Sequence, residues 1–164
     1  MDQSLLIVGM GQYGFFAREI AVAMRCFSRI DFVDDNHPDA VGKMTDLERL
    51  SERYNCAVVA IGEPKIRLDC MQKLCRYFSL ASLIHPMSYV SPSADVGEGC
   101  IVEPLAVIHT EAVIADGCLI SAGSVINHNS KVGKGCHIDC NATVPARASV
   151  PAYTKVAVGQ VYKD

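Results

Sequence analysis

The sequence predicts two folded parts, a small α/β domain over residues 1–82 and a parallel β-helix over residues 83–164. An aliphatic residue at every sixth position from Ile84 to Val156 predicts the β-helix. Alternating strand and helix patterns before residue 83 predict the α/β domain. The composition agrees with both parts: 50% of the residues are hydrophobic but only 7% are aromatic, with no tryptophan, which favours cores of small and aliphatic side chains.

Charge and cysteine content argue against several classes of protein. The formal net charge of -3 provides no basic field, so neither nucleic acid nor an anionic membrane is expected as a partner. The sequence has no long apolar run, and its amino terminus does not follow the pattern of an export signal, so a cytoplasmic protein is expected. The eight cysteines include no C-x-x-C pair, which favours reduced thiols, and no metal site is expected.

The α/β domain is expected to alternate four strands with three helices. The strands are predicted at Ser4–Val8, Ile30–Val33, Ala57–Ile61 and Leu80–Ile84. The helices are predicted at Gln12–Met24, Thr45–Tyr54 and Pro64–Phe78, the last with proline in its first turn. Such alternation implies a parallel sheet, and a domain of this size is half of a doubly wound, Rossmann-like fold with space for one nucleotide.

A glycine motif joins the first strand to the first helix. Gly9, Gly11 and Gly14 fit the pattern G-x-G-x-x-G in the strand-turn-helix context that the pattern requires. Glycines let the backbone approach a phosphate, and the helix amino terminus offers free N–H groups to it. Asp34 ends the second strand, where a carboxylate can accept hydrogen bonds from a ribose or a base. The motif alone is compatible with a sugar nucleotide, with NAD, or with a glycine turn that binds no ligand.

The six-residue pattern runs from residue 84 to residue 156 without an insertion. Its aliphatic positions are expected to fill the interior of the β-helix, and they are Ile84, Val90, Val96, Val102, Ile108, Ile114, Ile120, Ile126, Val132, Ile138, Val144, Val150 and Val156. A small residue recurs four places after nearly all of them and is expected near each corner. Three hexads form one triangular coil of eighteen residues, so Cys100, Cys118 and Cys136 are expected to stack in one column as interior packing residues.

Both parts of the sequence resemble the hexapeptide-repeat sugar acetyltransferases, a family that includes sialic acid O-acetyltransferases and UDP-4-amino-sugar N-acetyltransferases. Besides the hexads and the glycine loop, the resemblance rests on Asp34-Asp35 in FVDDN, on Ala60-Ile61-Gly62-Glu63 followed by Arg67, and on Ile84-His85-Pro86. It implies a left-handed β-helix, acetyl-CoA as co-substrate, and a first domain that holds a nucleotide-linked sugar. The substrate-binding residues that it implies are Gly9, Gly11, Gln12, Tyr13, Gly14, Asp34, Asp35, Gly62, Glu63 and Arg67. Gln12-Tyr13 departs from the Gly-Gly-His that is usual in this loop.

The resemblance also implies a general base. His128, in the segment NHNSKVG, matches the family histidine that takes a proton from an acceptor amine or hydroxyl as it attacks the thioester of acetyl-CoA. Asn129 follows it where the family commonly has Asp or Glu, and an amide there would orient the imidazole ring.

Further residues are implied at the acetyl-CoA site. His137 matches a family histidine that lines this site, and Asp139, Asn141 and Ala146 would fall along the same cleft. Asn141 can adopt a left-handed conformation, and Ala146 can offer its backbone N–H to an oxyanion.

The register of the hexads places both histidines outside the coil. His128 and His137 are nine residues apart, which is half a coil, so their side chains diverge on a single chain. They can share a site only if a neighbouring subunit brings one of them. This favours a closed ring of subunits, and the family forms homotrimers.

The expected function is therefore a sugar O- or N-acetyltransferase. A non-catalytic nucleotide-binding or assembly module is the first alternative, which Asn129, the altered glycine loop and the short carboxyl end favour. An NAD-binding oxidoreductase is the second, although the sequence shows neither a second half-domain nor an evident site for hydride transfer.

Overall fold

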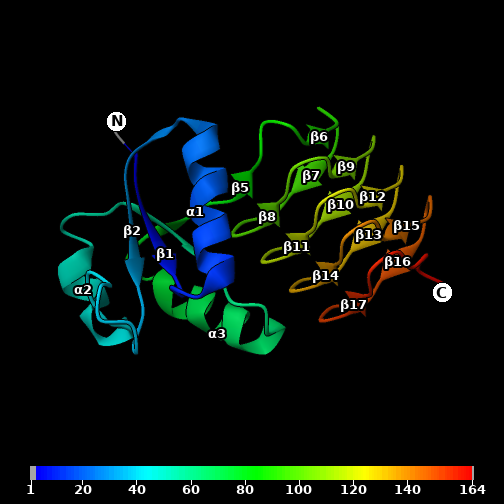
Figure 1. Ribbon diagram of the computed structural model, residues 1–164. Helices are drawn as coiled ribbons and strands as arrows, with labels where there is room; N and C mark the ends of the chain where they lie inside the picture. The colour runs from blue at the N-terminus through cyan, green and yellow to red at the C-terminus, as the bar shows by residue number, and fades with distance from the viewer. Residues whose placement is uncertain (1–2, 164) are drawn as a thin grey trace.

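The computed structural model describes residues 3–163, with an α/β part beside a β-helix (Figure 1). The α/β part is a parallel sheet of strand order β2-β1-β3-β4. Its strands are β1 (Gln3–Val8), β2 (Phe27–Val33), β3 (Cys56–Val59) and β4 (Ser79–Leu80). Its helices are α1 (Gln12–Met24), the short 3-10 helix η1 (Met44–Asp46), α2 (Leu47–Leu50) and α3 (Pro64–Leu74).

The two faces of this sheet bury different side chains of the same strands. Leu5 and Ile7 of β1 pack in one cluster with Ile20 of α1. Leu6 and Val8 of β1 point the other way and pack in a second cluster that includes residues of α2 and α3. Because successive side chains of a strand alternate between faces, a central strand covered on both sides has to be apolar where it is covered, as β1 is from Leu5 to Val8.

Several element boundaries differ from those expected. The helix predicted at Thr45–Tyr54 is shorter, because the chain turns after Leu50 and buries Tyr54, whose hydroxyl donates to Asp31 at 2.7 Å. The helix predicted to reach Phe78 ends at Leu74. The strand predicted at Leu80–Ile84 is two strands, because β4 pairs with β3 whereas β5 (Leu83–Ile84) pairs with β8 of the β-helix.

The β-helix has three parallel sheets, and paired residues in neighbouring coils are eighteen positions apart. The first, named the covered sheet, contains β5, β8 (Ile101–Val102), β11 (Leu119–Ile120), β14 (His137–Ile138) and β17 (Lys155–Val156). The second, named the uncharged sheet, contains β6 (Tyr89–Val90), β9 (Val107–Ile108), β12 (Val125–Ile126) and β15 (Thr143–Val144). The third sheet contains β7 (Asp95–Val96), β10 (Val113–Ile114), β13 (Lys131–Val132) and β16 (Ser149–Val150). The predicted fold class, a Rossmann-like domain followed by a left-handed β-helix, is confirmed.

The interior of the β-helix contains the residues that the six-residue pattern assigned to it. Every aliphatic position from Val102 to Val156 is buried, and the earlier three positions pack against this core while partly exposed at its open first end. Cys100, Cys118 and Cys136 are buried free thiols, each close enough to a backbone carbonyl to donate a hydrogen bond. The stacked cysteines are thus packing residues, as predicted.

The two parts are packed together through the covered sheet and through one corner of the β-helix. Leu83, Ile101 and Leu119 point out of the coil but are fully buried, because they share one cluster with α1. Figure 1 shows α1 between the sheet of the α/β part and the β-helix. The remaining outward positions of the covered sheet are His137 and Lys155, so this sheet changes from apolar to polar along its length. Within residues 3–163, no helix has the length and hydrophobicity needed to cross a membrane.

Candidate active site

The glycine loop has the geometry of an open helix amino terminus. Gly9 has a positive φ of 99°, a conformation that L side chains rarely adopt. A side chain at Gly14 would collide with the carbonyl oxygen of Gly9, so close packing of the loop on the helix requires glycine there. Gly11 is the N-cap of α1 and caps it with no side chain, and a Cβ at Gly11 would meet open space. The first N–H groups of α1 therefore face an accessible region, as a phosphate-binding loop requires.

The two acidic residues after β2 bind the backbone of their own domain. Asp34 accepts hydrogen bonds from the backbone N–H of Met10 at 2.8 Å, of Asn36 at 2.8 Å and of His37 at 3.1 Å. These bonds, that of Met10 first, lower the pKa of Asp34 below its ordinary value. Asp35 accepts from the backbone N–H of Met44 at 2.8 Å. Asp34 therefore fixes the glycine loop to the end of β2, and much of its capacity to accept bonds is used within the protein.

Arg67 has a different role from the predicted one. Its side chain is fully buried and donates to the carbonyls of Ile61 and Gly62 in its own domain, at 2.7 and 2.8 Å. It also donates to the carbonyls of Gly117 and Gly135 in the β-helix, at 2.7 and 2.9 Å. Four of its five N–H groups are thus used, so Arg67 joins the two parts of the molecule and is not available as a substrate ligand.

Tyr13 also points into the protein. Its hydroxyl donates to Glu103 of the β-helix at 3.1 Å, and burial, followed by the charge of Glu103, raises the pKa of Tyr13 well above its ordinary value. Gln12, beside it, is exposed. Of the two unusual residues in the glycine loop, only Gln12 is therefore free to reach a ligand with its side chain.

A cavity of about 440 Å³ lies where the α/β part meets the covered sheet. Gly62, Glu63 and Pro64 line one side of it, and His137 and Lys155 are among the residues that line the other. Glu63 is the N-cap of α3 and accepts from the backbone N–H of Lys65 at 3.2 Å. The structure thus brings two residues predicted to bind the sugar nucleotide together with one predicted to bind acetyl-CoA.

His137 lies in a polar network on the covered sheet. Its Nε2 is 3.0 Å from the hydroxyl of Ser121, and burial lowers its pKa below the ordinary value. Asp139 forms an ion pair with Lys155 at 3.0 Å. Burial opposes ionisation of Asp139, but the bonds from Lys155 and the Cys140 amide outweigh it and lower the pKa of this carboxyl.

The other residues predicted at the acetyl-CoA site lie in corner turns. Asn141 has a positive φ of 57°, the left-handed conformation expected for it. Ala146 lies in the turn between β15 and β16, one coil beyond His128. Asn141 and Ala146 are therefore at different corners of the β-helix.

His128 lies in the exposed turn after β12. Its Nδ1 is 3.0 Å from the side-chain oxygen of Asn129, and its backbone N–H donates to Asn127 at 2.8 Å. Asn129 has a positive φ of 57°, which Asn tolerates better than most residues. An oxygen at Nδ1 favours the tautomer that carries its proton there, which leaves Nε2 free to accept one. His128 follows the uncharged sheet whereas His137 belongs to the covered sheet, so one chain does not bring them together.

Glu103, Ser121 and Lys155 are site residues that the sequence reasoning missed. Glu103, Ser121 and Asp139 are spaced by eighteen and each directly follows an interior aliphatic residue, so they form one column on the covered sheet. That spacing was a usable signal, because polar residues recurring in one column of a solenoid lie side by side. No cluster of three or more potential metal-ligating side chains is found among residues 3–163.

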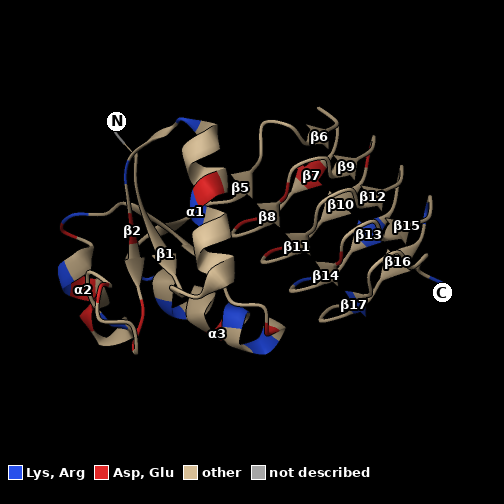
Figure 2. Ribbon diagram, viewed as in Figure 1, with Lys and Arg blue, Asp and Glu red and all other residues tan. Residues whose placement is uncertain are grey.

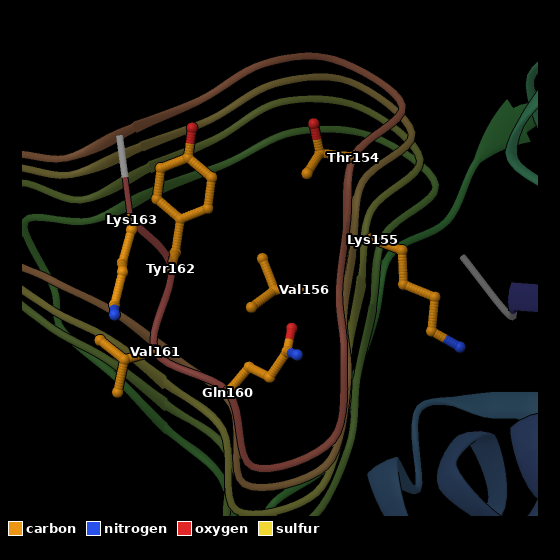
Figure 3. A pocket seen from close by; sticks show the side chains of 7 residues that line it. All are labelled: Thr154, Lys155, Val156, Gln160, Val161, Tyr162 and Lys163. Carbon is orange, nitrogen blue, oxygen red and sulfur yellow. The ribbon is translucent and has the colours of Figure 1, made fainter.

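A larger hollow, of about 660 Å³, lies at the end of the last coil (Figure 3). It is lined by Thr154, Lys155, Val156, Gln160, Val161, Tyr162 and Lys163. Val156 and Tyr162 pack against the interior of the β-helix, and Figure 3 shows Lys155 pointing out of the coil. This hollow borders the interior of the last coil and contains none of the predicted site residues.

The fold and the site together define a hexapeptide-repeat acyltransferase. Two family models match the chain: the PglD N-terminal domain at residues 4–74 and the bacterial transferase hexapeptide (six repeats) at residues 111–146. This combination of domains supports a sugar acetyltransferase. Among curated proteins, no relative with significant sequence similarity is found.

Solved structures of two acetyltransferases match nearly the whole chain. The acetyltransferase domain of PglB from Neisseria gonorrhoeae is 25% identical with a TM-score of 0.85, over 99% of this chain and 92% of that one. The same domain in complex with acetyl coenzyme A is 25% identical with a TM-score of 0.83, over 97% of this chain and 90% of that one. PerB from Caulobacter crescentus, in complex with CoA and GDP-perosamine, is 26% identical with a TM-score of 0.83, over 98% of this chain and 88% of that one.

Proposed function

We propose that this protein transfers the acetyl group of acetyl-CoA to an amino or hydroxyl group of a nucleotide-linked sugar. The observation that supports this most is the match along nearly the whole chain to one acetyltransferase solved with acetyl coenzyme A and to another solved with CoA and GDP-perosamine. The buried free thiols of the β-helix favour a reducing compartment, so we place the reaction in the cytoplasm.

In this proposal the α/β part holds the sugar nucleotide. Gly9, Gly11 and Gly14 leave the amino terminus of α1 open to a diphosphate, with Gln12 beside it. The exposed Asp35 is available to the nucleoside. Gly62 and Glu63 line the cavity that continues to His137, so the sugar would extend from the α1 terminus toward the β-helix.

His128 is the general base of the proposed reaction. Its Nε2 takes a proton from the acceptor N–H or O–H as that atom attacks the thioester carbonyl carbon. The tetrahedral intermediate then collapses, the C–S bond breaks, and the CoA thiolate receives the proton from the imidazolium. Asn129 holds the ring through Nδ1, and the backbone N–H of Ala146 is the candidate donor to the oxyanion. No acyl-enzyme is formed, so the protein needs no nucleophile of its own.

The complete site requires a second subunit in a proposed homotrimer. His128 and His137 lie on different sheets of one chain, so a neighbouring copy has to bring one of them to the other. The uncharged sheet is the face suited to this contact, because its strands carry no charged residue (Figure 2). Tyr89, Val107 and Val125 form an apolar column along its outer side. His137, Asp139 and Asn141 of one chain would then contact acetyl-CoA beside His128 of the next.

Release of free CoA thiol tests the proposal. The protein is incubated with acetyl-CoA and a panel of UDP- and GDP-linked amino sugars and hydroxyl sugars. We expect thiol release with at least one acceptor, and a 10²–10⁴-fold lower kcat in His128→Ala, the usual contribution of a general base. His109→Ala, which removes an exposed histidine about one coil away, serves as the matched control and should retain full activity.

Calorimetry separates the proposal from its alternatives. Nucleotide binding without CoA binding would favour a non-catalytic nucleotide-binding module. Tight binding of NAD would favour a dinucleotide-binding protein, although much of the hydrogen-bonding capacity of Asp34 is already used by backbone N–H groups. No thiol release with any acceptor, together with either binding result, would overturn the acetyltransferase assignment.

A further inference from the structure

A chain of hydrogen bonds connects the first turn of α1 to His137. The Tyr13 hydroxyl donates to Oε1 of Glu103 at 3.1 Å. The same Oε1 is 3.3 Å from the hydroxyl of Ser121, and that hydroxyl is 3.0 Å from Nε2 of His137. The backbone N–H of Ala122 donates to the other oxygen, Oε2, at 2.9 Å. The proposed base mechanism uses none of Tyr13, Glu103 and Ser121.

The surroundings of Glu103 fit an ionised carboxylate. Its side chain is buried, with 5% of the residue exposed, and no Lys or Arg among residues 3–163 forms an ion pair with it. Tyr13, Ser121 and Ala122 each point a donor at it. Three hydrogen-bond donors compensate the cost of removing a carboxylate from water. A protonated carboxyl group would fit less well, because its own O–H would point at groups that are themselves donors.

A carboxylate at this position determines the direction of the next bond. Ser121 has one hydroxyl proton, and a charged acceptor attracts it more strongly than a neutral imidazole does. The Ser121 oxygen then accepts a hydrogen bond from His137, so the proton of the neutral ring is on Nε2. Nδ1 of His137 has no partner within residues 3–163 and is left as an acceptor.

The charged groups around His137 do not provide a competing partner. Oδ1 of Asp139 is 3.7 Å from Nε2, beyond hydrogen-bond distance, and Asp139 is occupied by Lys155 and by the backbone N–H of Cys140. Burial is the largest influence on the pKa of His137 and lowers it, the charge of Asp139 opposes this by raising the pKa, and the charges of Lys155 and Arg67 lower it again. The net direction is downward, so the ring is neutral near pH 7 and its tautomer is a defined property.

We propose that Tyr13, Glu103 and Ser121 are positioning residues that hold His137 as its Nε2–H tautomer, with Nδ1 presented to an N–H or O–H of the ligand in the cavity beside Gly62. The role for the ligand rests on the proposed function, whereas the tautomer is a property of the protein alone. Tyr13 is in the first turn of α1, beside the glycine loop. The same hydrogen bonds therefore connect the proposed nucleotide-binding loop to His137 at the proposed acetyl-CoA site.

Nitrogen NMR of the labelled protein without ligands tests the tautomer directly. Long-range ¹H–¹⁵N correlation spectra distinguish a protonated from an unprotonated ring nitrogen, and His137→Gln assigns the signals. We expect the wild-type ring to be protonated at Nε2. In Glu103→Gln the Ala122 N–H keeps the amide oxygen at the Oε2 position, so the amide nitrogen faces Ser121 and donates to it. Ser121 then donates to His137, and the proton moves to Nδ1. In Ser121→Ala the ring becomes a mixture of both tautomers.

Matched variants separate this effect from general damage. Glu98→Gln neutralises an exposed carboxylate of the β-helix, and Ser91→Ala removes a buried hydroxyl that contacts Ser93; neither should change the His137 signals. In an active preparation, Ser121→Ala should lower kcat about tenfold without raising the KM for the sugar nucleotide, because ring orientation and not substrate contact is lost. In the NMR experiment, Tyr13→Phe should shift the His137 tautomer ratio toward Nδ1, as Glu103→Gln does, but by a smaller amount.

The outcome does not depend on catalysis. A wild-type ring protonated at Nδ1, or an unchanged tautomer in Glu103→Gln or Ser121→Ala, overturns the proposal. Failure to find an acetyl acceptor would remove the proposed function but leave the NMR result standing, so the two can fail independently.

Discussion

Burial gives His137 a pKa below its ordinary value of 6.5, and this makes a prediction about stability. The unfolded chain binds a proton near pH 6.5 that the folded protein binds only at lower pH. The stability associated with a neutral His137 is therefore complete above pH 6.5 and is lost as the pH falls through the range below it. Urea denaturation between about pH 5 and 7.5 should show a weaker pH dependence in His137→Gln than in the wild type.

Asp139 and Tyr13, the other groups of this network with shifted pKa values, titrate outside the range between about pH 5 and 7.5. The pKa of Asp139 is lowered from 3.8, so its contribution is lost only at more acidic pH. The raised pKa of Tyr13 places its titration far on the alkaline side. Parallel pH profiles for wild type and His137→Gln would mean that His137 is not buried as described.

For single residues, the sequence predicted where a side chain lies in the fold better than it predicted which groups that side chain contacts. It placed His128 outside the coil and expected the Asn129 amide to orient the imidazole ring, and the two side chains do interact. It did not predict that Arg67 and Tyr13 point into the protein, because their partners come from the β-helix, fifty and ninety positions away. Long-range pairings of this kind depend on how two domains pack, which no local pattern encodes.

A column of glycines at one corner of the β-helix provides a prediction at the scale of elements. Gly99, Gly117 and Gly135 each have a positive φ between 65° and 67°, and α3 packs directly over them. A Cβ at Gly117 would lie 2.6 Å from Leu68 and 2.8 Å from Met71, both on α3. Gly159 has a similar φ of 66° but open space around it, so it is a matched control.

Gly117→Ala should therefore destabilise the protein more than Gly159→Ala does. Both variants carry the strain of alanine in a left-handed conformation, about 1–2 kcal/mol. Only Gly117→Ala also crowds α3, which adds about 1–2 kcal/mol because flexible ends of Leu68 and Met71 have to move. Denaturation in urea measures both free energies of unfolding, and equal losses would show that α3 does not depend on the glycine column.

Element types were predictable from the sequence, but several ends were not. The predicted bounds of α1 are those of the structure, in which the glycine turn precedes Gln12 and the left-handed Arg25 ends the helix after Met24. The sequence prediction treated β4 and β5 as one strand. An apolar run such as Leu80–Ile84 gives no sign that its first part pairs with β3 and its last part with β8 of another sheet. The eighteen-residue coil was the most predictable feature, since each hexad repeats the same packing environment.

At the scale of the whole molecule, the placement of His128 and His137 predicts complementation between subunits. A trimer made only of His128→Ala, or only of His137→Ala, should be inactive or severely impaired. A mixed trimer, refolded from equal amounts of the two variants, contains interfaces at which one chain supplies an intact His128 and its neighbour an intact His137. Such interfaces should restore about a quarter of the wild-type rate by random assembly.

The control is a mixture of His128→Ala with the double variant His128→Ala/His137→Ala, which contains no intact His128 and should stay inactive. Activity that remains absent in the first mixture, with trimers shown by their mass, would mean that both histidines act from the same chain. A monomeric protein that is fully active would overturn the shared site.

The architecture as a whole followed from the sequence, whereas the contact between its parts did not. The outer face of a solvent-exposed sheet is usually polar, but Leu83, Ile101 and Leu119 point outward from the covered sheet. These apolar outward residues were the signal in the sequence that another element, α1, packs on this sheet. The cavity between Gly62 and His137 follows from this packing.

The hydrogen bonds of Arg67 to two successive coils determine at which end of the β-helix further coils can be added. Because the guanidinium is matched to the carbonyls of Gly117 and Gly135, the N-terminal domain is fixed to those particular coils. A duplication of one coil after Val156 would lengthen the molecule and leave this docking unchanged. The same duplication inserted before Gly99 would displace the domain by one repeat from its partners. Changes in repeat number should therefore be tolerated at the far end and selected against near the junction.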